Sequence, residues 1–308
     1  VFQLESSGMK QVLVGLQPQN LEDVIALISL YRPGPMDSIP TYLRNRHEPD
    51  KISYKTPQLA HILDVTNGCI VYQEQVMQIF RELAGFSFGQ ADNVRRAMSK
   101  KKHAVMEAER EHFVHGCTEP GHECPGCVAN GISEKVANEI YDEMSSFASY
   151  AFNKSHAACY AYVAFQTAYL KCHYPSEFMA ALLTSVLDNT DKVIEYSGEC
   201  ARLGIKVLPP DVNVSGGGFT ADENGQIRFG LNAVKNVGRN LIENVVRERR
   251  NKPYTSLYDF CKRMHGNELN RRAVECLIKA GAFDRLGNNR HSHVEAVEGI
   301  LKSIETDT

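Results

Sequence analysis

Five basic side chains crowd one predicted helix and could bind phosphate. They are Arg95, Arg96, Lys100, Lys101 and Lys102. At about 100° per residue, Arg96 and Lys100 share one side of the helix, while Arg95 and Lys102 share the neighbouring side. Arg offers a planar fork to phosphate oxygens, and Lys offers a mobile point charge. Two adjacent stripes of this kind can grip a triphosphate or a nucleic-acid backbone.

The basic cluster is local, because Glu107, Glu109 and Glu111 follow on the same predicted helix. A solvated helix face, stabilised by intrahelical pairs such as Glu107 with Arg110, would contain the same residue types. On spacing alone the solvated face is the simpler interpretation. Phosphate binding therefore needs support from other parts of the sequence.

A second group of side chains with ligand chemistry lies in a Cys-rich insert at residues 116–131. Its Cys-x-x-Cys pair, bounded by Pro and Gly, is typical of a zinc knuckle, in which two thiolates reach one tetrahedral ion. A flexible surface loop with free thiols has the same composition, so both interpretations stay open. The predicted ligands of a structural Zn²⁺ are Cys117, His122, Cys124 and Cys127, with His115 or His112 as alternatives to His122.

Composition limits the class of protein. The chain has 308 residues, of which 43% are apolar and 23% charged, as in ordinary soluble globular proteins. Its formal net charge of -3 excludes a basic protein that coats nucleic acid, so any such contact must come from local patches. No apolar run reaches membrane-span length, so we expect a cytoplasmic protein with no membrane partner. Because it begins at Val1 without a signal peptide, the chain is expected to start in mid-protein.

The elements that must position these residues are mostly helices. Helical spacing of apolar residues predicts helices over 21–30, 70–83, 90–115, 133–146, 155–172 and 176–187. Ser155 is the expected N-cap of the helix over 155–172. Its aromatic stripe, Tyr162, Phe165 and Tyr169, is expected to pack in the core rather than to form a base-stacking platform.

An extended, flexible stretch at residues 209–218 marks a boundary. Residues 219–229 then predict a small β-hairpin around an Asn-Gly turn, and the remainder is helical. The expected fold class is thus mainly α: a helical first domain over 1–215, followed by the β-hairpin and a further helical segment over 216–308.

Several stretches together resemble the alpha subunit of bacterial DNA polymerase III, the C-family of replicases, in the form without a built-in proofreading exonuclease. They follow the family's order and cover nearly the whole chain. The stretches are VFQLESSGM at 1–9, YRPGPM at 31–36, VYQEQVM at 71–77, LAGFS at 83–87, RRAMSKK at 95–101, AFNKSHAA at 151–158, FQTAYLK at 165–171 and YP at 174–175.

The resemblance implies that residues 1–215 form the polymerase fingers. It also implies that Arg95, Arg96, Lys100 and Lys101 face the triphosphate of the incoming dNTP. Asn153, Lys154, Ser155 and His156 correspond to the family's motif near the nascent base pair. A cationic Lys154 and the first amides of the following helix suit an anion, although a lone His156 would more often be structural.

Residues 229–248 are similar to a helix-hairpin-helix, in which a short helix, a tight apolar turn and a second helix hold a DNA phosphate through backbone amides. Asn236 stands where the family usually has Gly, and Asn tolerates a positive φ better than most residues. Residues 271–303 are expected to form a degenerate second unit, with its turn at 279–283. The predicted DNA-binding residues are Lys235, Asn236, Val237, Gly238 and Arg239.

Phosphoryl transfer to a primer end needs Mg²⁺ held by clustered carboxylates. The family's Asp cluster lies outside this sequence, which contains no Asp-x-Asp, so the chain alone is expected to be inactive. The implied partners are primer-template DNA, dNTP, the sliding clamp and other replisome subunits. A non-enzymatic helix-hairpin-helix module and a zinc-stabilised interaction module are the alternatives.

Overall fold

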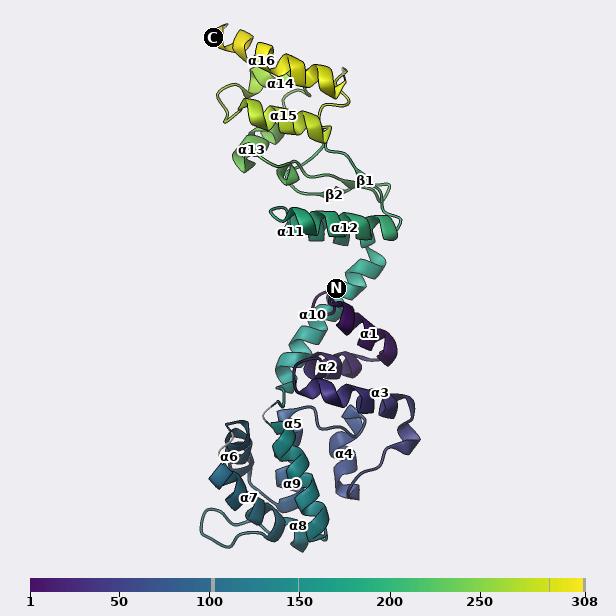
Figure 1. Ribbon diagram of the computed structural model, residues 1–308, viewed down its shortest axis with the longest axis vertical. Coiled ribbons are helices and arrows are strands. Elements are labelled where there is room, and N and C mark those ends of the chain that lie inside the picture. The colour runs from purple at the N-terminus through teal and green to yellow at the C-terminus, as the bar shows by residue number, and fades with distance from the viewer. Residues whose placement is uncertain (101–102, 149, 288, 307–308) are drawn as a thin grey trace. The chain divides into compact units, whose positions relative to one another are not determined.

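The computed structural model describes residues 1–100, 103–148, 150–287 and 289–306, and the chain divides into two compact units, Val1–Ala168 and Tyr169–Thr308. Helices dominate both units (Figure 1). The expected mainly α fold class is therefore confirmed. No helix among the described residues is both long enough and apolar enough to cross a bilayer. The predicted boundary near residue 215 separates two functional domains rather than two compact units, and it stays a prediction.

The first unit is built from helices joined by short turns. Asn20 caps α2 by accepting a hydrogen bond from the amide of Asp23, which confirms the predicted start of that helix. The helices of this unit are α1 (Ser7–Leu16), α2 (Leu21–Leu30), α3 (Ile39–His47), α4 (Ala60–Leu63), α5 (Gln73–Ala84), α6 (Phe88–Ser99), α7 (His103–His115), α8 (Gly126–Ala129), α9 (Glu134–Ala148) and α10 (Lys154–His173), whose last residues belong to the second unit.

The prediction of one helix over 90–115 is wrong, because α6 ends at Ser99 and α7 begins at His103. Both helices bury apolar faces in the same core, with Met98 contributed by α6 and Phe113 by α7. A single straight helix of that length could not return to this core. Lys101 and Lys102 lie outside the described residues, so the predicted pair of basic stripes reduces to Arg95 and Arg96 on α6 and Lys100 at its end.

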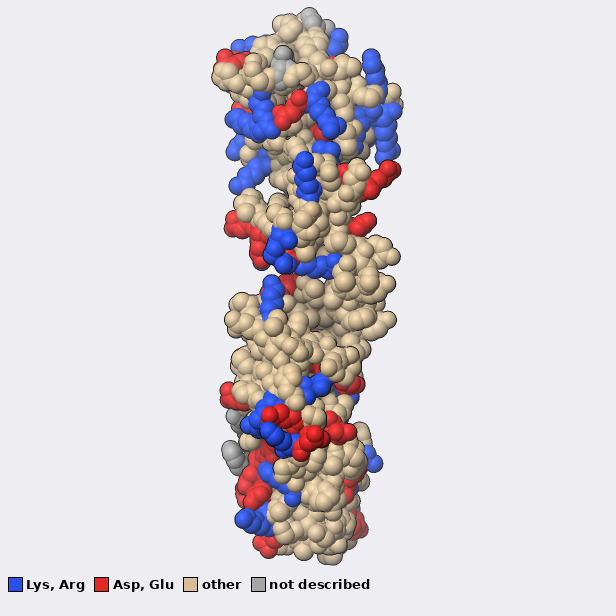
Figure 2. Space-filling view, turned by 90° about the vertical axis from the view of Figure 1, so that its right-hand side faces the viewer, with Lys and Arg blue, Asp and Glu red and all other residues tan. Residues whose placement is uncertain are grey.

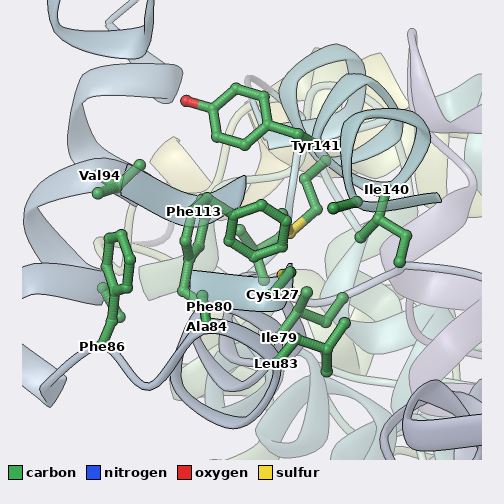
Figure 3. Packing of buried hydrophobic residues seen from close by; sticks show 14 of the residues in the cluster. Ile79, Phe80, Leu83, Ala84, Phe86, Val94, Phe113, Cys127, Ile140 and Tyr141 are labelled. Carbon is green, nitrogen blue, oxygen red and sulfur yellow. The ribbon is translucent and has the colours of Figure 1, made fainter. Parts of the chain in front are cut away.

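Phe80 on α5 occupies the centre of this core. Its ring centroid lies 5.0 Å from that of Phe113 and 5.9 Å from that of Tyr141 on α9, both edge-on, and Figure 3 shows the packing of this cluster. Edge-on aromatic pairs add to the burial energy of each ring. The cluster fixes α5, α6, α7 and α9 as one rigid group.

The predicted core position of the aromatic stripe on α10 is wrong. The side chains of Tyr162, Phe165 and Tyr169 are 57%, 56% and 48% exposed. The face of α10 that packs on α1 to α3 instead presents small residues, among them the fully buried Ala161 and Ala164. Small side chains allow close helix approach, and the aromatic residues therefore lie on the opposite, exposed side of α10.

The second unit combines helices with a small sheet. The predicted hairpin is confirmed: β2 (Thr220–Ala221) pairs antiparallel with β3 (Ile227–Arg228). Asp222 closes the turn by accepting hydrogen bonds from the amides of Asn224 and Gln226. β1 (Val207–Leu208) adds a parallel partner to β3 that the sequence did not indicate. The helices are α11 (Pro175–Ser185), α12 (Thr190–Arg202), α13 (Arg239–Glu248), α14 (Leu257–Met264), α15 (Arg271–Ala280) and α16 (Arg290–Thr306).

Candidate phosphate-binding sites

Residues from three distant stretches of the first unit line one pocket of about 490 Å³. The pocket opens between the start of α5, the helix α6 and the residue that precedes α10. It therefore joins parts of the YQEQ, RRAM and FNKSH stretches, which are far apart in sequence. The lining residues are Gln73, Glu74, Met77, Gln78, Arg81, Glu82, Phe88, Asp92, Arg95 and Asn153.

Glu74 connects α5 to the first turn of α10. Its carboxylate accepts hydrogen bonds from Asn153 Nδ2, at 3.0 Å, and from the amide of Lys154, at 3.2 and 3.1 Å to its two oxygens. Asn153 Oδ1 in turn accepts a hydrogen bond from the amide of His156, at 2.9 Å. The N-cap of α10 is thus Asn153, and the prediction of Ser155 is wrong. The positive end of α10 is occupied by an anion of the chain itself.

Backbone pairing fixes this junction. The amide of Gln73 donates to the carbonyl of Phe152 at 3.0 Å, and the amide of Phe152 donates to Val71 at 3.3 Å. The guanidinium of Arg32 lies 4.0 Å from the centroid of the Phe152 ring and donates to the carbonyl of Tyr150 at 2.9 Å. Burial lowers the pKa of Arg32 from its ordinary value. The YRPGP stretch therefore supports the same site.

The arginines of α6 are held by a carboxylate on their own helix. Arg95 donates to Asp92 through Nη2 at 2.7 Å and Nε at 3.0 Å, and its Nη1 donates to Gln73 at 2.8 Å. Arg96 Nη2 lies 2.7 Å from the other oxygen of Asp92. The hydrogen bonds from Arg95 hold the pKa of Asp92 below its ordinary value. Lys154 Nζ is likewise paired, with Glu22 at 3.0 Å.

The structure brings only part of the predicted nucleotide set to the pocket wall. Arg95 and Asn153 line it, whereas Arg96, Lys100 and Ser155 are exposed nearby on the same two helices. The exposed ring of His156 stacks between those of Phe152, at 5.4 Å, and Tyr160, at 4.4 Å, an arrangement consistent with a structural role.

Sequence reasoning missed the acidic partners of these cations. Asp92 was detectable, because it precedes Arg95 and Arg96 by three and four residues, the spacing of intrahelical ion pairs. Glu22, the partner of the Lys154 ammonium, and Glu74, which accepts from the Lys154 amide, were not, because both contacts join residues far apart in sequence.

The predicted zinc ligands do not form a metal site. Within residues 103–148, and in the other described ranges, no group of three His, Cys, Asp or Glu side chains is placed to hold an ion. Cys117 and Cys124 pair through their backbones, each amide donating to the other's carbonyl at 2.9 Å. Cys127 is fully buried in the core of the unit (Figure 3). Burial raises the pKa of its thiol to about 12.

In the second unit, the turn of the predicted helix-hairpin-helix joins a single 3-10 turn, Leu231–Ala233, to α13. Asn236 adopts the left-handed conformation with φ 62°, consistent with its standing in for Gly. Gly238 precedes α13 and supplies no side chain to cap it. The first amides of α13 therefore lack the usual capping acceptor and remain suited to a phosphate oxygen.

One side of the helix-hairpin-helix turn packs on the core of the second unit, and the other side is exposed. Val234 is buried, and Val237 packs on the core that contains Leu241 and Ile242. In contrast, Lys235, Asn236, Gly238 and Arg239 are exposed. Arg239 Nη2 lies 2.6 Å from Asp188 Oδ2. Residues 228–290 carry fourteen Lys and Arg against six Asp and Glu, and Figure 2 shows basic side chains gathered over the C-terminal helices.

The two helices expected over residues 271–303 also form. α15 ends at Gly281, whose φ of 94° suits only Gly without strain, and α16 follows. Arg290 donates to the carbonyl of Lys279 at 3.0 Å and pairs with Asp284 at 2.6 Å. The cation at this second turn is thus committed to an internal contact, as is Arg239 of the first hairpin with Asp188, whereas Lys235 makes no ion pair with a described residue.

Comparison with known proteins identifies both regions. A model of the bacterial DNA polymerase III alpha subunit finger domain matches residues 1–121, and a helix-hairpin-helix motif matches residues 204–293. DNA polymerase III subunit alpha of Thermus aquaticus is 50% identical over 308 residues, covering 98% of this chain and 24% of the relative. The proteins of the same name from Bacillus subtilis and Escherichia coli K12 are each 44% identical, covering 99% of this chain and 26% of theirs. The chain thus spans about a quarter of the length of these relatives.

Proposed function

Since this chain belongs to the family of bacterial DNA polymerase III alpha subunits, of which it contains finger-domain and helix-hairpin-helix sequence, we propose that it binds the incoming dNTP and the primer-template DNA during chain elongation. The reaction served is that of a DNA-directed DNA polymerase. The proposal that the chain binds dNTP rests on one observation. Residues of three separate motif stretches line one pocket, and Arg95 lies in its wall.

The chemistry assigned to the pocket is electrostatic. Negative charge develops on the leaving pyrophosphate during nucleotidyl transfer, and cations already in place stabilise it. Arg95 and Arg96 supply forked donors, and Lys100 supplies a further charge at the end of α6. Asp92 neutralises Arg95 and Arg96, and a triphosphate with more charge displaces it from these two cations.

The catalytic Mg²⁺ is assigned to the rest of the polymerase. Two-metal transfer requires clustered carboxylates, and the described residues of this chain contain no such cluster. Its acidic side chains in the pocket are committed to other contacts: Asp92 to Arg95, Glu74 to the start of α10, and Glu82 to Gln78 and His61. The chain alone is therefore proposed to bind substrates without joining nucleotides, in a cytoplasmic replisome that includes the sliding clamp.

The hairpin of the second unit is assigned to the DNA backbone. Amides of α13 and the side chains of Lys235 and Arg239 contact phosphates and read no bases. A helix-hairpin-helix module without enzymatic context would explain this part alone, but it has no use for the pocket formed by residues 73–95 and 153.

The test is a titration of fluorescent primer-template DNA with the full chain, followed by anisotropy. The next correct dNTP should tighten binding of the parent and of Arg44→Ala, a control whose exposed side chain lies on α3 outside the pocket. It should fail to do so for Arg95→Ala/Arg96→Ala. If the dNTP effect survives in that double variant, the pocket is not the triphosphate site.

A further inference from the structure

Helix α15 lies directly beside the DNA-binding hairpin. Asn236 Nδ2, at the tip of the hairpin, lies 3.5 Å from Cys276 Sγ on α15. Residues four before and three after Cys276 share its side of the helix, and these are Arg272 and Lys279. Both side chains are exposed. The hairpin and this flank of α15 therefore both carry exposed basic side chains.

The other flank of α15 is used differently. Arg271 donates to Glu275 at 2.7 Å and to Glu298 of α16 at 2.7 Å. Glu298 in turn pairs with Lys302 at 2.8 Å. The charge of Arg271 is thus balanced within the unit, and this flank carries a mixed network rather than a basic surface.

Arg272 has no such partner. It makes no hydrogen bond or ion pair with any residue in the described ranges, and the same holds for Lys235 on the hairpin. Lys279 has only Glu275, at 3.6 Å. The acids beside the hairpin are Asp188, which pairs with Arg239 at 2.6 Å, and Glu268, which accepts a hydrogen bond from Asn240 at 3.2 Å. Two unpaired cations on adjacent elements are a surface that suits an external polyanion.

We propose that Arg272, assisted by Lys279, extends the phosphate-binding surface of the hairpin onto α15, so that one duplex DNA backbone contacts both elements. The proposal rests on the DNA-binding function proposed for the hairpin and adds to it a contact that lies outside the helix-hairpin-helix turn. The contact is to phosphate, so it adds affinity without sequence preference.

The experiment measures the affinity of the full chain for a fluorescent duplex by anisotropy between low and moderate salt. Each phosphate contact contributes about 0.9 to the slope of log affinity against log salt. Arg272→Ala should lower that slope by about one and weaken binding by a factor of about three to ten, as Lys235→Ala should. Arg271→Ala, one residue away on the other flank, should leave the slope unchanged, and Arg272→Lys should restore it.

The outcomes separate the two proposals. If Lys235→Ala lowers the slope but Arg272→Ala behaves like Arg271→Ala, the extension onto α15 is wrong while the hairpin keeps its function. If the parent does not bind duplex DNA even at low salt, the hairpin assignment fails and the extension fails with it. Circular dichroism on each variant verifies that helix content is retained, and retention is expected because Arg272 is exposed.

Discussion

The cations at the pocket of the first unit are paired with carboxylates of the chain, whereas two cations on the hairpin surface of the second unit are not. In the pocket, Arg95 is paired with Asp92, and next to the pocket residue Asn153, Lys154 is paired with Glu22. On the hairpin surface, Lys235 and Arg272 make no ion pair with any described residue. Both regions are assigned to phosphate ligands, but on the hairpin surface pairing is partial, since Arg239 has Asp188 and Lys279 has Glu275.

This difference implies different selectivity. A ligand of the pocket must outcompete carboxylates fixed at hydrogen-bond distance, which favours a compact ligand of high charge such as a triphosphate. A ligand that contacts Lys235 and Arg272 displaces counterions there, so its affinity depends strongly on salt. The internal anions of the pocket also stabilise the fold, since Glu74 joins α5 to α10.

The largest effect is expected for Glu74→Ala. It removes the acceptor for the amide of Lys154 and for Asn153, and charge-assisted hydrogen bonds of this kind contribute about 1.5–3 kcal/mol each. Unfolding of the first unit in urea, followed by circular dichroism, should shift by about 2 kcal/mol. Glu243→Ala, an exposed position on α13 without a carboxylate contact to another element, is the matched control. Equal stability of the two variants would contradict the structural function assigned to Glu74.

The next effect is on DNA binding without nucleotide. Lys235→Ala/Arg272→Ala should reduce the salt slope by about two, whereas Arg95→Ala/Arg96→Ala should leave it within about 0.5 of the parent. The reason is that the α6 arginines are already neutralised by Asp92. A lower slope in the Arg95/Arg96 variant would mean that the pocket also contacts the DNA backbone and that the two regions do not differ as described.

A smaller effect, of opposite sign, is expected for Asp92→Asn. Loss of the carboxylate charge frees Arg95 and Arg96 for an external anion, so the affinity for a fluorescent dNTP should rise by a factor of about three to five, the equivalent of about 1 kcal/mol. Asp142→Asn, which removes the partner of Arg110 away from the pocket, serves as the control. Weaker dNTP binding in Asp92→Asn would indicate instead that Asp92 orients the arginines for the ligand.

The smallest effect on ligand binding is expected for Glu199, a paired carboxylate that belongs to neither site and acts on stability at low pH. Hydrogen bonds from Arg202 and Lys171 lower its pKa from 4.5 to about 2. A lowered pKa stabilises the fold above the unfolded value, and that contribution is lost as the pH falls through the folded value. The stability advantage of the parent over Glu199→Gln should therefore be complete above pH 4.5 and vanish near pH 2, with dNTP and DNA binding at neutral pH unchanged. Acid titration of the circular dichroism signal for both chains measures this.

What the sequence determined by itself is local. The cap of α2 at Asn20, the Asp222 turn and the left-handed Asn236 all depend on hydrogen bonds or steric limits within a few residues. These could be predicted because the interacting groups are neighbours in the chain. The mainly helical fold followed for the same reason, since helical periodicity is a local pattern.

Tertiary packing decided the rest. Where α6 ends and which face of α10 is exposed depended on a core shared by distant helices. Burial of Cys124 and Cys127 in that core also decided the arrangement of the predicted zinc ligands, which form no metal site among the described residues. The contact of Glu74 with Lys154 and the contact of Asn236 with Cys276 likewise join residues far apart in sequence. Such contacts have no local signature, because only the folded backbone brings their partners within hydrogen-bond distance.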